Sequence, residues 1–198
     1  KPSKFEVNFN VPAVIRDMQI SNLNSLTTDS ASRNVLSLQQ RTNLTFRCET
    51  AQLPSRTLMT ADQKIYGFSE KYPYESSYND AEFVFLVTED MTEKLLFDAW
   101  MELINPVSNF NFTYKSNYVS DISINQYDMQ NKLTYQALLV DAFPIDVGQL
   151  DLDWTTDGYH KLTVVFAYSY WTNVQTTSIV DNLESTLLTG INNTLTSF

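Results

Sequence analysis

Side chains that could carry out chemistry are few in this sequence, and they stand apart from one another. Asp151 and Asp153 place two carboxylates on one face of an extended segment, as a cation site or an acid pair requires. In a chain with a net charge of −10, a solvated strand edge is the simpler interpretation. His160, the single histidine, has no Ser or Cys partner pattern, and Cys48, the single cysteine, alternates with apolar neighbours as a core residue does.

Other kinds of site are missing as well. A lone histidine argues against a His-based metal site, and a lone cysteine excludes an intramolecular disulfide. Four glycines are too few for a phosphate-binding loop, and neither GxxxxGK nor GxGxxG occurs. The Tyr and Trp residues alternate along strands without interleaved Lys or Arg, which indicates core or interface rather than base stacking. We therefore expect no enzymatic activity, no cofactor and no metal, and a function performed by surfaces.

Composition agrees with a protein whose surface is covered by other copies. Charged residues make up 18% of the 198 residues, against a usual share of about 25%, while aromatic residues reach 13%. The acidic balance, with a pI near 4.4, argues against a protein that grips DNA but not against a conduit for DNA. No apolar run approaches about 18 residues and no signal peptide is present, so we expect no membrane association.

These surfaces depend on strands, which the spacing of apolar residues predicts. Alternation indicates strands at 5–11, 44–49, 82–88, 119–127, 132–143 and 159–171; both faces of the last are fairly apolar, so we expect it to be central. Asp90 as N-cap and Glu93 near the first turn predict a helix over 91–103, with Trp100 on its apolar stripe. We expect a mainly β fold: an antiparallel sandwich or barrel of about seven or eight strands flanked by this helix.

Three further segments lack a strand pattern. Residues 18–40 read as a protruding hairpin or short helix, and 54–79 as a long loop of the kind that a partner orders. A C-terminal helix is predicted over 179–195, and it needs a surface to lie on, in its own barrel or in a neighbouring subunit. Its apolar stripe consists of Ile179, Leu183, Leu187, Ile191 and Leu195. We accordingly divide the chain into a β-domain over 1–171 and a helical extension over 172–198.

Four segments, at 46–54, 78–100, 143–154 and 168–171, carry motifs in a fixed order. The motif and core residues that we single out are Trp100, Phe143, Pro144, Gly148, Leu152, Trp154 and Trp171. In order and spacing these segments resemble the tail tube proteins of contractile-tailed bacteriophages, over about residues 44 to 171.

The resemblance implies a structural subunit of the virion. Six copies would close into a ring through sheet edges, and rings would stack into a tube whose lumen conducts DNA during ejection. The implied partners are copies of the chain, a tail sheath outside, the baseplate and tail terminator at the ends, and DNA and the tape measure protein passing without specific binding. Ring stacking would use the long loop, through Pro54, Arg56, Tyr66, Phe68, Tyr72, Tyr74 and Tyr78.

Two alternatives stay open. Two segments, the excursion at 18–40 and the helix at 179–195, are additions to the family pattern. They would serve as additional contacts to the next ring or the sheath, or they would mark the chain as a tube initiator of the baseplate, which carries extensions. A carbohydrate-binding or hydrolytic β-sandwich is the alternative from another class. It requires exposed aromatic residues beside carboxylates in a groove.

Overall fold

The computed structural model describes residues 4–12, 14–15, 45, 47–64, 66–152, 158–173 and 175. Over these residues the chain forms nine β-strands and the helices α3 and α4, so the predicted mainly β, antiparallel fold is confirmed. The excursion at 18–40, the helix at 179–195 with its five apolar residues, and Trp154 lie outside the described residues.

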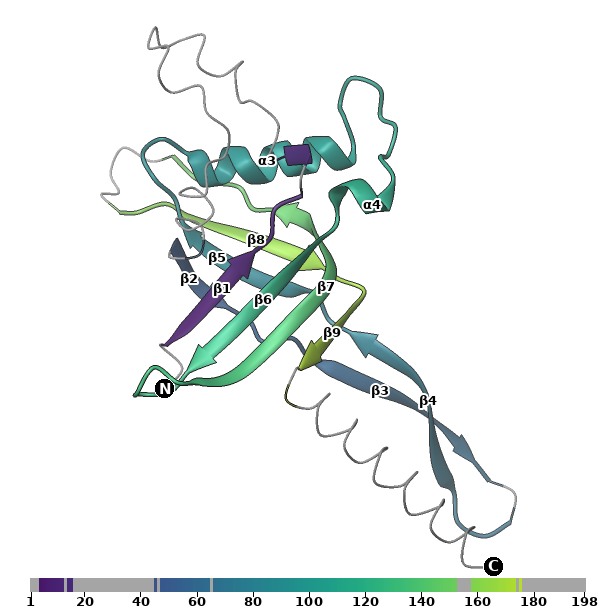
Figure 1. Cartoon of the computed structure of the whole chain (residues 1–198). Helices are drawn as coiled ribbons and strands as arrows, with labels where there is room; N and C mark the ends of the chain where they lie inside the picture. Colours follow the sequence, from purple (N-terminus) through teal and green to yellow (C-terminus); the bar gives the residue numbers. More distant parts are fainter. Residues whose placement is uncertain are drawn as a thin grey trace, which may run out of the picture.

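Seven strands form one antiparallel sheet in the order β1-β6-β7-β8-β5-β2, with β9 paired to β7 (Figure 1). Their bounds are β1 (Phe5–Phe9), β2 (Cys48–Ala51), β5 (Ala81–Leu86), β6 (Ser120–Tyr127), β7 (Leu133–Val147), β8 (Lys161–Ala167) and β9 (Tyr170–Asn173). β1 and β2 end this order without pairing with each other, so the described strands do not close into a barrel. The sheet bends into two layers, one with β1, β6 and β9 and the other with β2, β5 and β8.

Aromatic side chains fill the space between the two layers. The ring of Phe9 in β1 lies 5.4 Å from the rings of both Phe83 and Phe85 in β5, and 5.9 Å from Phe166 in β8. All four rings are buried, which follows from the alternation that places every second residue on the inner face. Their burial and edge-to-face packing provide much of the apolar stabilisation of the sandwich.

Helix α3 (Thr92–Ile104) covers one end of the two layers (Figure 1). Phe97 and Trp100 lie on its buried face, 6.0 and 5.8 Å from the ring of Phe166. The indole Nε1 of Trp100 donates a 2.8 Å hydrogen bond to the carbonyl of Tyr118, at the end of the short helix α4 (Lys115–Tyr118). The helix predicted over 91–103 is therefore present, shifted by one residue.

The start of α3 differs from the sequence prediction. Met91 takes the N-cap position, with a left-handed φ of 52° and no side-chain hydrogen bond, so Asp90 is not the cap. Instead the side chain of Glu93 contacts the residues before the helix. The Glu93 carboxylate accepts hydrogen bonds from the backbone N–H of Thr88 at 3.0 Å and from the hydroxyl of Thr88 at 2.7 Å. Nη1 of Arg47 donates to the same carboxylate at 2.6 Å. Burial alone raises the pKa of Glu93, but these donors and the Arg47 charge outweigh burial and lower the pKa.

Strand β7 belongs to both layers. It pairs with β6 as far as Ala142 and with β8 from Phe143 onward. Asp141, at the crossing point, has a φ of 57°, in the left-handed region that residues with a Cβ rarely adopt and that Asp tolerates better than most. The change of layer therefore occurs at this residue.

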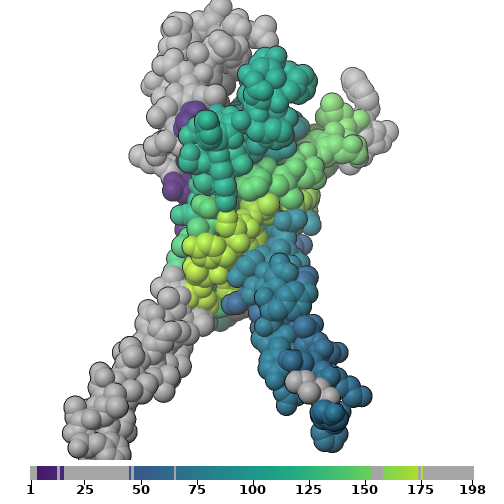
Figure 2. Space-filling model, turned by 90° about the vertical axis from the view of Figure 1, so that its right-hand side faces the viewer, coloured from purple at the N-terminus to yellow at the C-terminus, as the bar shows by residue number. Residues whose placement is uncertain are grey.

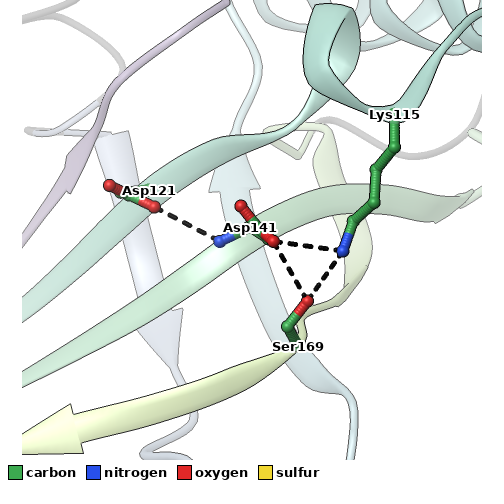
Figure 3. A network of polar contacts seen from close by, with 4 residues as sticks. All are labelled: Lys115, Asp121, Asp141 and Ser169. Carbon is green, nitrogen blue, oxygen red and sulfur yellow. Dashed lines mark hydrogen bonds and ion pairs between the residues drawn. The ribbon is translucent and has the colours of Figure 1, made fainter.

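Polar contacts from three other segments hold this corner in place (Figure 3). Nζ of Lys115, in α4, lies 3.1 Å from Oδ2 of Asp141 and donates to the hydroxyl of Ser169 at 2.8 Å. The backbone N–H of Asp141 donates to Oδ1 of Asp121, in β6, at 3.2 Å. Ser169 lies between β8 and β9, so the network joins the corner of β7 to the break between those strands.

That break corrects the sequence prediction of one strand over 159–171. β8 ends at Ala167 and β9 begins at Tyr170, and the two pair with different halves of β7. Because β7 changes layer at Asp141, the chain that runs alongside it must be interrupted at the same level. Two further predictions are also corrected: the strand predicted at 44–49 begins only at Cys48, and the long loop at 54–79 is a hairpin of β3 (Arg56–Gln63) and β4 (Glu70–Tyr78).

We expect Glu93→Gln to lower the free energy of unfolding by about 2 kcal/mol at neutral pH, because charge-assisted hydrogen bonds to a buried carboxylate are lost. The pKa of Glu93 is lower in the folded than in the unfolded state. Its contribution is therefore complete above an unfolded pKa of about 4.3 and is lost as the pH falls through the folded pKa. Urea unfolding should show the difference between variant and parent shrinking below that pH.

The matched control for this test is Asp98→Asn on the same helix. Asp98 forms an exposed pair with Lys94 at 3.0 Å, which should contribute less than about 0.5 kcal/mol. Equal losses in the two variants would contradict the role of Glu93.

At the corner of β7 we expect Asp141→Val to lower the free energy of unfolding by about 1–2 kcal/mol, because a β-branched residue is strained at this φ. Asp141→Asn tolerates the same conformation, and Lys115→Met removes an exposed ion pair and an exposed hydrogen bond to Ser169, so each should cost less than about 1 kcal/mol. Urea unfolding of the three variants measures these costs. A loss in Lys115→Met as large as that in Asp141→Val would show that the ion pair, rather than the backbone, stabilises the corner.

Candidate assembly surfaces

The hairpin formed by β3 and β4 extends away from the body of the molecule (Figures 1 and 2). All eight residues of β3 are exposed, as are residues 70–75 of β4. Among the described strands, β3 and β4 pair only with each other, and an isolated two-stranded sheet is marginally stable in water. A surface supplied by another molecule would stabilise this arm.

Aromatic residues concentrate on the outer part of this hairpin. Tyr66 and Phe68, on either side of Gly67 in the turn, are each 95% exposed. Gly67 has a φ of 83°, which a residue with a side chain rarely adopts. Tyr72 and Tyr74 are exposed further along β4; the hydroxyl of Tyr72 donates to Glu70, which raises the pKa of this tyrosine. The tip is therefore an exposed apolar surface that the described residues leave uncovered.

The base of the hairpin is fixed to the body. The indole Nε1 of Trp171 donates to the carbonyl of Ser55 at 3.3 Å, and the side-chain amide of Asn79 donates to the Ser55 hydroxyl at 3.0 Å. The ring of Tyr78 lies 6.3 Å from that of Tyr168. Of the seven residues that the sequence assigns to ring stacking, Pro54 and Tyr78 lie half-buried at this base. The others, Arg56, Tyr66, Phe68, Tyr72 and Tyr74, are exposed along the arm.

A second exposed apolar surface lies on the loop 105–114 between α3 and α4. It carries Val107, Phe110, Phe112 and Tyr114, which are 66% to 84% exposed. Sequence reasoning missed this surface, because the segment after the helix-ending proline has neither a helical stripe nor a long alternating run. The sequence signal for this surface was the alternation of Phe110, Phe112 and Tyr114 in a stretch without charged residues.

Hydrogen bonds fix the backbone of this loop. The hydroxyl and the N–H of Thr113 donate to the carbonyls of Leu103 at 2.7 Å and Ile104 at 3.0 Å, and the N–H of Phe110 donates to Pro106 at 2.8 Å. Phe110 has a φ of 53°. The exposed side chains are therefore presented by a defined loop.

The outer strands of the large sheet form a third candidate surface. β1 and β2 each have one side that is paired with no described strand. Unpaired backbone N–H and C=O groups on such an edge favour the addition of a strand from another chain.

The motif residues occupy different environments. Trp100 and Pro144 are buried, and Phe143 packs its ring 5.3 Å from Tyr118. The N–H of Gly148 donates to the carbonyl of Thr163 at 2.8 Å, and a Cβ at this position would lie 3.0 Å from the same oxygen, so the close approach to β8 requires glycine. Trp171 is half-buried, whereas Leu152 is 82% exposed and is not part of the subunit core.

Of the residues considered for chemistry, Asp153 lies outside the described residues, and the others, Asp151, His160 and Cys48, show no shared site in the described structure. Asp151 is exposed, His160 is half-buried, and no group of three or more His, Cys, Asp or Glu among the described residues could hold a metal ion. Burial raises the pKa of the Cys48 thiol to about 12, which is unsuited to a nucleophile. Across the described ranges, no helix is long and apolar enough to cross a membrane.

Two surface hollows in the described part of the chain bear on the carbohydrate alternative. One is lined by Asp121 and Asp141 together with residues 10–12, 119 and 120, and it has carboxylates but no aromatic ring. The other is lined by Lys4, Phe5, Tyr127 and Asn131; it has aromatic rings, and the nearby carboxylate of Glu6, which accepts a 2.8 Å hydrogen bond from Tyr127, is not among its lining residues. Neither combines the two features that this alternative requires.

Solved structures with a similar fold come from contractile injection systems. A chain of the PVC sheath–tube complex in the extended state is 12% identical, with a TM-score of 0.56 over 87% of this chain and 89% of that chain. A chain of the anti-feeding prophage baseplate is 14% identical, with a TM-score of 0.54 over 86% of this chain and 92% of that chain. A chain of the PVC sheath/tube terminator is 12% identical, with a TM-score of 0.55 over 86% and 92%. At these identities the likeness shows the fold alone.

Sequence comparison gives the family. The family model described as phage tail tube protein matches residues 1–174, which is most of the chain. No individual curated protein matches the sequence. The chain therefore belongs to the phage tail tube protein family and is a structural component of the virion tail.

Proposed function

We propose that six copies of this chain close into a ring and that these rings stack into a tube whose lumen conducts DNA during ejection. The observation that carries the proposal is the β3–β4 hairpin, an arm of exposed backbone and aromatic side chains in a chain of the tail tube family. Such an arm gains stability when a second ring supplies the surface that it lacks.

Two different contacts are needed to build a tube from one kind of subunit. A head-to-tail contact that closes on itself makes a ring, and a second contact along the axis makes a stack. The unpaired sides of β1 and β2 suit the first contact, because ring closure covers both edges. The hairpin suits the second contact, because it extends beyond the body (Figure 1).

The acidic balance of the chain suits a DNA conduit. With a net charge of −10 the chain has no excess of Lys and Arg to neutralise phosphates, so passing DNA would gain little affinity for the wall. The six-fold symmetrised baseplate and the sheath–tube complex among the similar structures support six copies in a ring and a sheath around it.

A tube initiator in the baseplate is the second candidate. It is favoured by the baseplate chain, whose TM-score is nearly the same as that of the tube chain. The two candidates differ in the number of copies in each virion: a single ring for an initiator and many rings for the tube. Gel densitometry of virions against a protein of known copy number separates them.

Negative-stain microscopy of the purified chain tests the tube itself. We expect six-fold rings and hollow tubes from the parent chain, and loss of tubes from the hairpin variant Tyr66→Ser/Phe68→Ser. Its thermal unfolding should be unchanged, because both side chains are exposed in the subunit. Tyr159→Ser, which also removes an exposed tyrosine but not from the hairpin, is the control and should leave tubes intact. Monomers alone from the parent at high concentration, and virions without tubes, would overturn the proposal.

We further propose that the extension from residue 172 clamps neighbouring subunits through the helix over 179–195. Since β9 runs to Asn173, a stop codon after Gln175 removes the extension without cutting a strand. The shortened chain should keep its cooperative unfolding, but its tubes should dissociate at a lower temperature than those of the full chain. Light scattering during heating measures dissociation, and tubes of unchanged stability would exclude the clamp.

A further inference from the structure

We infer that the loop 105–114 is the surface on which the β3–β4 hairpin of a second copy docks when rings stack. The inference rests on the proposed stacking function and names the partner of the hairpin.

Both surfaces are exposed, and the described part of the subunit provides no apolar cover for either. Val107, Phe110, Phe112 and Tyr114 lie exposed within a stretch of eight residues, and Tyr66, Phe68, Tyr72 and Tyr74 lie exposed on the hairpin. Exposed apolar residues gathered in this way mark interaction sites rather than ordinary surface. Burying one surface against the other would remove both from water, at about 25 cal/mol for each Å² covered.

Charge selects the loop as the partner of the hairpin. Residues 105–114 contain no Asp, Glu, Lys or Arg. Residues 56–78 contain three basic residues, Arg56, Lys64 and Lys71, and three acidic residues, Asp62, Glu70 and Glu75, so their formal charges cancel. In a chain with a net charge of −10, two copies repel each other wherever acidic surfaces meet, whereas these two surfaces can approach without that repulsion.

Their placement makes the contact intermolecular. The hairpin and the loop lie at opposite ends of the body in both views, with the hairpin at the bottom and the loop at the top (Figures 1 and 2). One subunit therefore cannot bring its own hairpin to its own loop. A contact between two different surfaces of identical chains is head-to-tail and repeats along an axis, as a stack of rings requires.

The loop is also prepared for binding. Its backbone is held by the hydrogen bonds of Thr113 to the last turn of α3 and by that of Phe110 to Pro106. A surface that is already ordered loses little conformational entropy when it binds.

A complementation experiment tests the inference. The loop variant Phe110→Asn/Phe112→Ser keeps an intact hairpin; asparagine is chosen because it tolerates the positive φ at residue 110. The hairpin variant Tyr66→Ser/Phe68→Ser keeps an intact loop. Each variant alone should fold normally and stop at the unstacked assembly. A mixture of the two preformed assemblies should form one junction, which sedimentation velocity detects as a mass about twice that of either variant.

The possible outcomes separate the inference from the function on which it rests. If the parent chain forms no tubes, the proposed function fails. If the parent and the loop variant both form tubes while the hairpin variant does not, stacking stands and the loop is not the receptor. A mixture that keeps the mass of the separate variants overturns the inference too, because hairpin and loop then do not meet. Tyr159→Ser serves as the control and should stack by itself.

Discussion

The bend of β7 at Asp141 is the constraint on which the rest of the fold depends. One strand supplies pairing to both layers, so β6 and β9 must lie on one side of the bend and β8 on the other. The interruption at Ser169 follows from the same geometry, as does the contact of α4 with this corner through Lys115. With the layers thus placed, the rings of Phe9, Phe83 and Phe166 meet between them, and α3 covers one open end.

The same architecture leaves defined surfaces without cover. The aromatic interior is sealed, with Trp100 and Phe166 fully buried, yet comparable side chains at Phe68 and Phe112 are exposed at the two ends of the body. Most of the strongly exposed aromatic residues of the described structure gather in these two groups, although Tyr159 lies outside both. Membership of the tail tube family agrees with this division, because a tube gains its length from contacts between units that are already folded.

Sequence patterns located the elements whose environment is asymmetric. Strands such as β5 and β6 have one buried face and one less buried face, so alternation reveals them, and α3 is revealed by its apolar stripe. The hairpin has no such asymmetry: both faces of β3 are exposed, and 54–79 therefore reads as a loop. The loop at 105–114 escaped notice for a similar reason, since its apolar residues face no core. Alternation does not reveal a surface that faces no core of its own subunit. It also does not reveal the break at Ser169, because that break depends on β7, which is distant in sequence.

The acidic charge of the chain limits which of its surfaces can form contacts between copies. At physiological ionic strength, repulsion between acidic subunits decays over about 8 Å, so it acts mainly at surfaces in contact. An acidic chain that polymerises must therefore either pair its charges across the interface or keep charge away from it. With 13 basic against 23 acidic residues, the charges of identical copies cannot all be paired with one another, so some acidic residues must stay away from the contacts. The proposed contact between the uncharged loop 105–114 and the hairpin, whose formal charges cancel, would meet the second condition, because no net charge is brought to the interface.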